Sequence, residues 1–420
     1  MPTLVLDPAM PSPAPPDWSG SIWIGAVDAA DDIGGDVELT GASGYSRVRL
    51  LVRRGRCPLG FVELPAADGV LDPNDLQAAV RRLPDGPAAV DDGPANPISV
   101  VLCTRDRPEF LRSALSSLLA MDYPDFEIVV VDNASATSAT GDVVASVNDP
   151  RVRLASEPVP GLARARNRGV LAATHDIVAF TDDDVVVDPQ WLRGIDAGFA
   201  AAPDIACVCG IVPSGELRSY SQAYFDGRVT WARSCTPTIY RLVDPPPGHV
   251  LFPFKVGEYG TGANFALRRS ALLQVGGFDE ALGVGSPTRG GEDVDMFVRM
   301  LLDGHALMYQ PQALVWHRHR ADLDALHEQI VGYGVGLGAW IAKLMTSRRT
   351  APMVLRRSVR ALRHVRTMTR VDVDPGAETT APNSRSLAIA ELRAALRGPL
   401  AYARARRSGA RPTPLRTAAS

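Results

Sequence analysis

From about residue 98 onward, short apolar runs alternate with stretches of helical periodicity, and this alternation limits the chain to few folds. Residues 98–103 (ISVVLC), 127–132 (EIVVVD) and 176–184 (DIVAFTDDD) have the composition of strands buried on both faces of a parallel sheet. Between them, Pro108 begins a segment whose leucines recur at helical spacing, and residues 161–173 form another helical segment. Strands and helices alternating in this way predict an α/β fold, with a mostly parallel sheet flanked by helices.

The segments on either side of this pattern differ from it in composition. Residues 21–83 contain short β-like runs and one short helix, whereas helical segments follow residue 320. We therefore predict six units: a disordered Pro-rich segment at 1–20, a small β-rich module at 21–83, a linker at 84–97, the α/β domain at 98–320, a helical extension at 321–370 and a disordered basic tail at 371–420.

Composition excludes several classes of protein. With 46% hydrophobic and 22% charged residues the chain can bury a full core, and a net charge of −3 gives no support for a nucleic-acid partner. No run reaches the ~20 apolar residues that a membrane span needs, and the first residues lack the features of a signal peptide. The five cysteines form neither a C-x-x-C motif nor a disulfide framework, so we expect reduced thiols and a cytoplasmic protein.

Polar residues end three of the predicted strands, where ligands of such sheets bind. These residues are Thr104, Asp132 and the triplet Asp182, Asp183 and Asp184. Because three adjacent carboxylates repel one another, the triplet needs a counter-ion. Carboxylate oxygens suit Mg²⁺ or Mn²⁺ bound jointly with a diphosphate. The same triplet also fits a solvated turn that caps the next helix.

Two further groups of residues could act on a substrate. Glu292 and Asp293 begin a predicted helix after a Gly-rich loop, where a carboxylate on a rigid support can serve as a general base. The helix dipole alone also explains acidic residues in a first turn. His317 and His319 follow a short strand and point to the same face. A neutral imidazole there could complete a metal site, although a surface histidine needs no such role.

A predicted helix with three arginines lies in the segment GLARARNRG, residues 161–169. Guanidinium groups suit phosphate oxygens because they donate two hydrogen bonds in parallel. Arg164 and Arg168 lie one turn apart and fit a solvated basic face, which leaves Arg166 as the candidate. The chain has no Walker motif and no G-x-G-x-x-G after a strand, which argues against a P-loop NTPase and a Rossmann dehydrogenase.

Taken in order, these motifs resemble family 2 of the inverting glycosyltransferases with the GT-A fold. The segments that carry the resemblance are ISVVLCTRDRPEFLRSALSSLL, EIVVVDNAS, GLARARNRGV, FTDDDVVVDPQWL, GTGANFALRRSALLQVGGFDEALG, GGEDVDM and VWHRHR. They cover roughly residues 97–320, so the resemblance implies that the α/β domain is a GT-A catalytic domain. It does not extend to the N-terminal module.

The resemblance also implies roles for individual residues. Asp293 would be the catalytic base, with Glu292 as the other candidate, and Asp184 would bind the metal. His317 would be the second metal ligand, with His319 as its rival. The residues implied to bind the donor are Thr104, Asp132, Arg166, Asn167, Asp182 and Asp183.

The implied reaction transfers a sugar from a nucleotide-diphosphate donor to an acceptor hydroxyl with inversion, using Mn²⁺ or Mg²⁺. The acceptor would be a glycan, a lipid-linked molecule or a small molecule in glycan, cell-envelope or glycolipid biosynthesis. The loop at 283–291 would close over the donor and exclude water. Family members often carry an aromatic residue before the Glu-Asp pair, where this chain has Gly291.

Two other functions remain open alternatives. A sugar nucleotidyltransferase would need a Gly-rich basic loop after the first strand, and TRDRPEF has no glycine. A non-catalytic scaffold that binds nucleotide sugars would typically have lost an aspartate or the base, and both are present here.

The segment at 346–370 has eight arginines and no acidic residue. Leu355, Val359, Leu362 and Val365 recur at three- and four-residue steps, which predicts a basic amphipathic helix. Such a helix fits an anionic membrane surface, and would place the protein peripherally on the inner face of the cell membrane. It fits equally well a helix packed on the catalytic domain with a solvated basic face.

Overall fold

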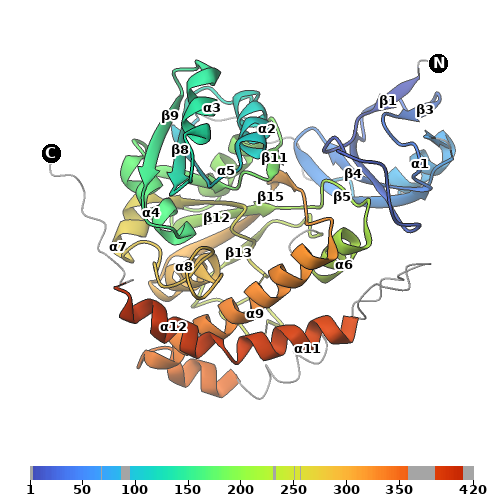
Figure 1. Cartoon of the computed structure of the whole chain (residues 1–420). Helices are drawn as coiled ribbons and strands as arrows, with labels where there is room; N and C mark the ends of the chain where they lie inside the picture. The colour runs from blue at the N-terminus through green and yellow to red at the C-terminus, as the bar shows by residue number, and fades with distance from the viewer. Residues whose placement is uncertain are drawn as a thin grey trace.

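The largest unit of the protein is an α/β domain built on one nine-stranded sheet. A computed structural model describes residues 3–67, 69–86, 95–229, 233–249, 251–255, 257–357 and 384–409 (Figure 1). The strands of the sheet are β7 (Ile98–Thr104), β8 (Phe126–Asn133), β9 (Val152–Glu157), β10 (Ile177–Thr181), β11 (Val185–Val187), β12 (Ile205–Ile211), β13 (Thr238–Tyr240), β14 (Asn264–Arg268) and β15 (Ala306–His317). Their order is β11-β15-β12-β14-β10-β7-β8-β9, and β13 also pairs with β15.

Six of these strands run in the same direction, namely β7, β8, β9, β10, β12 and β15. The other three, β11, β13 and β14, run antiparallel to them. The predicted α/β class with a mostly parallel sheet is therefore confirmed. Antiparallel β14 lies between β10 and β12, so the carboxyl end of β10 stands beside the amino end of β14.

Alternate residues of the strands supply two cores, one on each face of the sheet. On β7, for example, Val100 and Leu102 enter one core and Val101 enters the other. Helices cover both faces: α2 (Pro108–Leu119), α3 (Ala139–Val147) and α5 (Trp191–Ala200) pack on the first core, whereas α4 (Leu162–Ala172), α7 (Arg269–Gln274) and α8 (Glu292–Leu302) pack on the second. The sheet is thus the middle layer of a three-layer domain.

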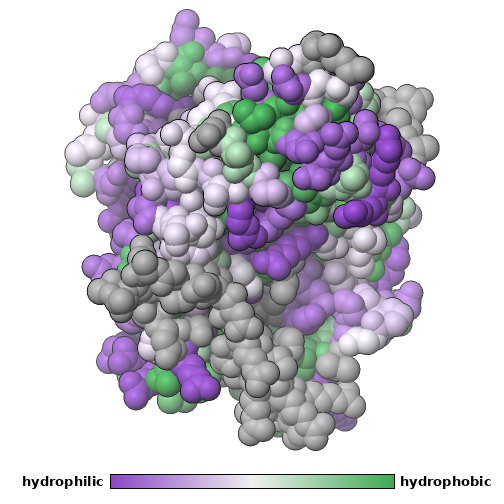
Figure 2. Space-filling view, turned by 90° about the vertical axis from the view of Figure 1, so that its right-hand side faces the viewer, coloured by the Kyte–Doolittle hydropathy of each residue, from purple (hydrophilic) through white to green (hydrophobic). Residues whose placement is uncertain are grey.

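A small β-rich module precedes this domain and lies beside it, on the right in Figure 1. It contains two three-stranded sheets, β1-β3-β6 and β2-β4-β5, and one helix. The elements are β1 (Leu4–Leu6), β2 (Trp23–Asp28), β3 (Val37–Leu39), β4 (Arg47–Arg54), β5 (Cys57–Pro65), β6 (Val70–Leu71) and α1 (Pro73–Val80). Seen from this side, the surface is mainly hydrophilic, with apolar residues gathered in its upper part (Figure 2).

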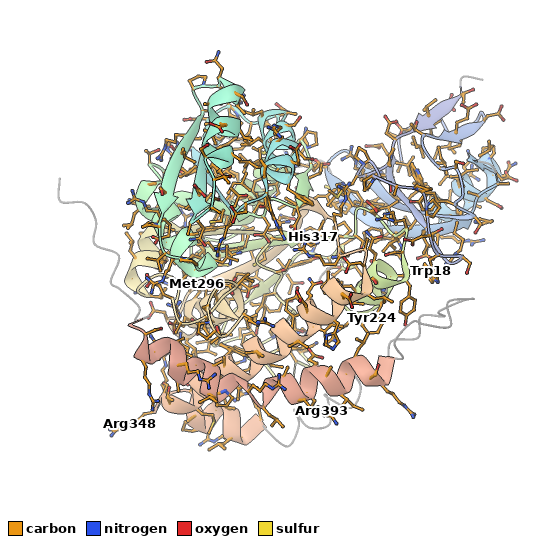
Figure 3. The ribbon with its side chains drawn as sticks, in the orientation of Figure 1. Trp18, Tyr224, Met296, His317, Arg348 and Arg393 are labelled. Atoms are coloured by element: carbon orange, nitrogen blue, oxygen red, sulfur yellow. The ribbon has the colours of Figure 1, made fainter. Side chains whose placement is uncertain are left out.

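The prediction that residues 1–20 are disordered is wrong for the described residues from 3 onward. β1 pairs in parallel with β3, and Met10 is buried in the core of the α/β domain. Trp18 packs edge-on against Tyr220 of α6 (Tyr220–Arg228), and Figure 3 shows Trp18 near Tyr224 of the same helix. The segment is ordered because these apolar side chains find partners that are remote in sequence.

Salt bridges fix the module to the α/β domain. Arg49 and Arg53 of β4 pair with Asp226 at 2.8 Å and with Asp188 at 2.7 Å. Both carboxylates are nearly buried, so water screens these pairs less than pairs on an open surface.

Helices of the C-terminal region pack against one side of the domain. The long helix α9 (Leu323–Thr346) is followed in the described chain by α11 (Ser384–Ala395) and α12 (Gly398–Arg407), which lie along the lower edge of Figure 1. The predicted disorder of residues 371–420 is therefore wrong for 384–407, because Leu387, Tyr402 and Ala405 are buried. None of the helices in the described residues is long and apolar enough to cross a bilayer.

Only part of the predicted basic helix falls within the described chain. Val359, Leu362 and Val365, like everything else between 358 and 383, lie outside the described residues. Leu355 is described, and its side chain is exposed.

Candidate active site

The three adjacent aspartates lie on the turn between β10 and β11, at the carboxyl end of β10. Asp183 points inward, where the Thr104 hydroxyl donates a hydrogen bond to it at 2.7 Å and Arg107 pairs with it at 3.0 Å. Asp182 keeps 30% of its side chain exposed. Burial and the charge of Asp184 raise the pKa of Asp182 to about 6, although Arg166 acts in the opposite direction.

Asp184 and His317 are brought together by strand pairing. β11 runs antiparallel to β15 with Val185 opposite His317, so Asp184 stands next to this histidine. Nε2 of His317 lies 3.3 Å from Oδ1 of Asp184. Burial by itself would raise the pKa of Asp184, but His317, Arg320 and Arg107 more than offset it and hold that pKa below its ordinary value. The charge of Asp184 in turn raises the pKa of His317, against the effect of burial.

His319 is placed differently from His317. Its ring is buried against Phe225, with the ring centres 4.5 Å apart, and Nδ1 lies 3.0 Å from Nδ1 of His317. Burial and His317 lower the pKa of His319 well below its ordinary value, so this imidazole is neutral at pH 7. Nε2 of His319 is buried without a hydrogen-bond partner in the described structure. Of the two histidines, His317 is the one beside Asp184.

Glu292 and Asp293 lie in the first turn of α8, and the residue directly before this turn is Gly291. Gly291 has a φ of 91°, in the left-handed region that favours glycine. The Glu292 carboxylate accepts a hydrogen bond from Arg166 at 2.9 Å and is almost fully buried. Burial and the adjacent Asp293 raise the pKa of Glu292 to about 7, which Arg166 partly opposes. Oδ2 of Asp293 accepts a hydrogen bond at 2.9 Å from the backbone N–H of Gly262.

Arg166 connects the two groups of carboxylates. Its guanidinium, on α4, pairs with Glu292 and lies 3.5 Å from Oδ1 of Asp182. It also donates to the carbonyl of Gly262 at 3.0 Å. Arg166 is therefore a buried cation between the aspartate turn and the start of α8.

A cavity of about 740 Å³ opens beside these residues. Asp182, Asp184 and His317 line one side, and His317 lies near the middle of the molecule in Figure 3. The loop before α8 and one face of α9 line the opposite side, through Val284, Gly285, Ser286, Arg289, Ala325, Glu328, Gln329, Gly332 and Tyr333. Four arginines that were given no role from the sequence also line it, namely Arg107, Arg289, Arg318 and Arg320. Arg107 and Arg320 each lie three residues after the end of a strand. This position is the feature of the sequence that could have identified them as cavity residues.

Of the six predicted donor-binding residues, Asp182 lines this cavity and the other five do not. The Asn167 side chain is buried, and its amide both donates to and accepts from the backbone of Phe278, at 3.0 Å and 2.8 Å. Asp132 ends β8 as predicted, is half-buried, and accepts a hydrogen bond from the N–H of Ser135 at 3.3 Å. The Asn167 side chain thus fixes the backbone at Phe278, which precedes the loop that lines the cavity.

Comparison with known proteins agrees with this geometry. Residues 99–276 match the family described as Glycosyl transferase family 2. The domain that these residues form belongs to glycosyltransferase family 2. The family predicted from the order of the sequence motifs is therefore confirmed.

Relatives of this chain come from bacteria and archaea. The pre-mycofactocin glycosyltransferase of Mycobacterium tuberculosis is 30% identical over 282 residues, which cover 67% of this chain and 53% of that protein. The glucosyl-dolichyl phosphate glucuronosyltransferase of Haloferax volcanii is 26% identical over 239 residues, covering 54% of this chain and 72% of the relative. This chain thus spans about half the length of the mycobacterial relative.

Among solved structures, a mannosyltransferase from Pyrobaculum calidifontis in complex with GDP-Man and Mn²⁺ is 18% identical. The match covers 74% of this chain and 89% of that protein, with a TM-score of 0.49.

Proposed function

We propose that this protein transfers a glycosyl unit from a nucleotide-diphosphate sugar to an acceptor hydroxyl, with inversion at the anomeric carbon. The observation that carries the proposal is the aspartate turn on the wall of the cavity, joined through Arg166 to the carboxylates at the start of α8. Inversion in one displacement needs a base on the acceptor side and charge stabilisation on the leaving-group side. The start of α8 and the aspartate turn fit these two tasks.

The donor set at the aspartate turn fits a divalent cation. Asp184 and His317 offer a carboxylate oxygen and an imidazole nitrogen 3.3 Å apart, which suits Mn²⁺ or Mg²⁺. Within the described residues, no group of three or more His, Cys, Asp or Glu side chains could hold a metal, so further ligands would come from the donor and water. When bound, the cation would act as a Lewis acid toward the diphosphate oxygens.

The arginines of the cavity suit the same diphosphate. Arg107 and Arg320 line the cavity beside the aspartate turn, and Arg289 lines it from the loop before α8. Arg107 and Arg320 lie 3.3 Å and 3.6 Å from Asp184. A bound phosphate would give these guanidinium groups a second anionic partner.

Asp293 is proposed as the base. Glu292 is committed to the buried pair with Arg166, whereas Asp293 is only half-buried and lies against Gly262, whose neighbours Thr261 and Ala263 line the cavity. In this arrangement Glu292 holds Arg166, and Arg166 fixes the carbonyl of Gly262 next to the base.

The proposal is tested by measuring sugar transfer and donor hydrolysis with a panel of nucleotide sugars, with and without EDTA. We expect activity to disappear with EDTA and to return with Mn²⁺ or Mg²⁺. Full activity in EDTA would refute the metal site. Donor binding without turnover for any acceptor would favour a non-catalytic scaffold. Formation of a nucleoside triphosphate from the nucleotide sugar and added pyrophosphate would favour a sugar nucleotidyltransferase.

The assignment of the base is tested with a matched pair of variants. Asp293→Asn should lower kcat by ~10²-fold or more and leave donor affinity nearly unchanged, because size and hydrogen bonding are kept. Glu292→Gln should lower kcat less and should also weaken donor binding, because it disturbs Arg166. Near-normal turnover of Asp293→Asn, with loss in Glu292→Gln, would exchange the two roles.

A further inference from the structure

The two C-terminal helices, α11 and α12, have one buried side and one exposed side. The buried side packs on α9 and on α6. Leu387 joins the cluster of Tyr224 and Ile330, and Glu391 pairs with Arg228 of α6. Farther along, Arg406 pairs at 2.8 Å with the buried Asp279 of the α/β domain. The helices are therefore docked on the protein and are held in a fixed orientation.

The opposite side of the same helices exposes large apolar residues. The exposed fractions are 50% for Ile389, 56% for Leu392, 81% for Leu396 and 55% for Leu400. These residues are three or four positions apart, so they share one helical face. Arg397 at the junction keeps a helical backbone conformation, which carries the face from α11 into α12. We call these four residues the apolar face.

Exposed arginines flank the apolar face. Arg393, Arg397, Arg404 and Arg407 are all exposed, and none of the four forms an ion pair with another described residue. Glu391 is the one acidic residue between 384 and 409, and it is turned away toward Arg228. Arg393 points away from the body of the molecule at its lower edge in Figure 3, where Arg348 also lies.

We propose that the apolar face and its arginines rest on an anionic membrane surface, where the protein glycosylates an acceptor anchored in that membrane. The second half of this proposal rests on the proposed glycosyl transfer. Apolar side chains of a surface helix enter the boundary between headgroups and acyl chains, while arginines contact anionic headgroups. A second copy of the chain fits this face less well, because a symmetric contact would bring arginines against arginines.

The position of the cavity sets how far a membrane-bound acceptor must reach. Helix α9 separates the cavity from α11: Gln329, Gly332 and Tyr333 line the cavity, whereas Gly334 touches the backbone of Glu391 on the other side. An α-helix with its side chains is about 10–12 Å wide. Because α11 itself also lies between α9 and the proposed membrane surface, the cavity lies roughly two helix widths, about 20–24 Å, from that surface. A membrane-anchored acceptor would therefore need a head that extends this far from the bilayer.

Co-sedimentation of the full-length protein with vesicles tests the surface without any need for activity. We compare vesicles of neutral phosphatidylcholine with vesicles containing anionic phosphatidylglycerol, at about 0.1 M and about 0.5 M salt, where screening differs strongly. We expect binding to the anionic vesicles that weakens at the higher salt. Arg393→Gln combined with Arg397→Gln should lower the partition coefficient roughly 25-fold, about fivefold for each arginine. Leu392→Ser, Leu396→Ser and Leu400→Ser together should lower it by about tenfold or more.

Matched controls separate this face from general surface effects. Val5→Ser, Val70→Ser and Val243→Ser remove exposed apolar residues elsewhere, and Arg82→Gln with Arg168→Gln removes exposed arginines elsewhere. These variants should bind like the parent, and circular dichroism should show that all variants are folded. No vesicle binding by the parent, or equal binding by all variants, would overturn the proposal. So would a dimer, seen by light scattering, that the serine variants dissociate. Because binding is measured without a donor, failure of the catalytic proposal would leave this result unaffected.

Discussion

Replacing Arg166 tests whether this residue connects the two halves of the site. Its side chain is only 3% exposed, and it pairs with Glu292, which is 6% exposed. Arg166→Met keeps much of the side-chain volume but leaves a buried carboxylate without its cation. Breaking a buried ion pair in this way costs about 3–5 kcal/mol of folding free energy. The variant should also lose activity, because the carbonyl of Gly262 beside the proposed base loses its hydrogen bond.

A double-mutant cycle separates the interaction between Arg166 and Glu292 from the other contacts of these two residues. Replacing both members of a buried ion pair by apolar residues is often close to neutral, so Arg166→Met with Glu292→Leu should recover most of the lost stability. A residual loss of about 1 kcal/mol is expected from the Gly262 carbonyl. Stability is measured as the urea midpoint from tryptophan fluorescence, without metal or donor. A single variant as stable as the parent, or a double variant with the summed losses, would refute the reasoning.

Three further predictions follow from buried contacts. The pKa of Glu292 is raised from 4.5 to about 7, so its contribution to stability is present below pH 4.5 and is lost as the pH rises through 7. Glu292→Gln should flatten this fall in urea midpoints, and an unchanged pH slope would contradict it. A Cβ on Gly336 would lie 2.9 Å from the backbone of Gly290, whereas one on Gly332 would have no atom nearer than 3.8 Å. Gly336→Ala should therefore displace the loop at residues 289–290 and lower kcat/KM by about tenfold or more. Gly332→Ala is the control and should leave kcat/KM nearly unchanged. Equal losses of kcat/KM in the two variants would contradict this contact. Arg406→Gln should lower the free energy of unfolding by about 1–2 kcal/mol, because Asp279 loses one of its two cationic partners. Limited proteolysis should then cut residues 384–409 faster. Arg407→Gln, which changes an exposed arginine, should have neither effect.

Local pattern was sufficient to predict the sheet and the strand-end aspartates. Buried parallel strands leave continuous apolar runs, and the residues that follow them must lie at one edge of the sheet. The aspartate triplet, Glu292 and His317 could therefore be found from the sequence. The pairing of Arg166 with Glu292 joins residues 126 positions apart, and nothing local to either residue encodes it. The choice between His317 and His319 depends in the same way on the pairing of β11 with β15.

Composition misled the prediction at both ends of the chain. Prolines near the N-terminus and arginines near the C-terminus are typical of disordered segments. Met10 and Leu387 are nevertheless buried, because each meets an apolar surface supplied by another unit. Single apolar residues in a polar segment have no periodicity, so their partners can be recognised only once the other units are in place.

The four alternating glycines of α9 have a mechanical consequence. Gly332 and Gly336 face the loop at residues 289–290, and Gly334 and Gly338 face the backbone of Glu391 and Ala395 in α11. At most helix contacts a side chain can change rotamer and absorb a small displacement of its neighbour. At these positions main chain meets main chain or lies close to it, so α9 behaves as a rigid spacer between the cavity loop and α11. A movement of α11 of even an ångström would have to be matched on the other side of α9, at the loop that lines the cavity.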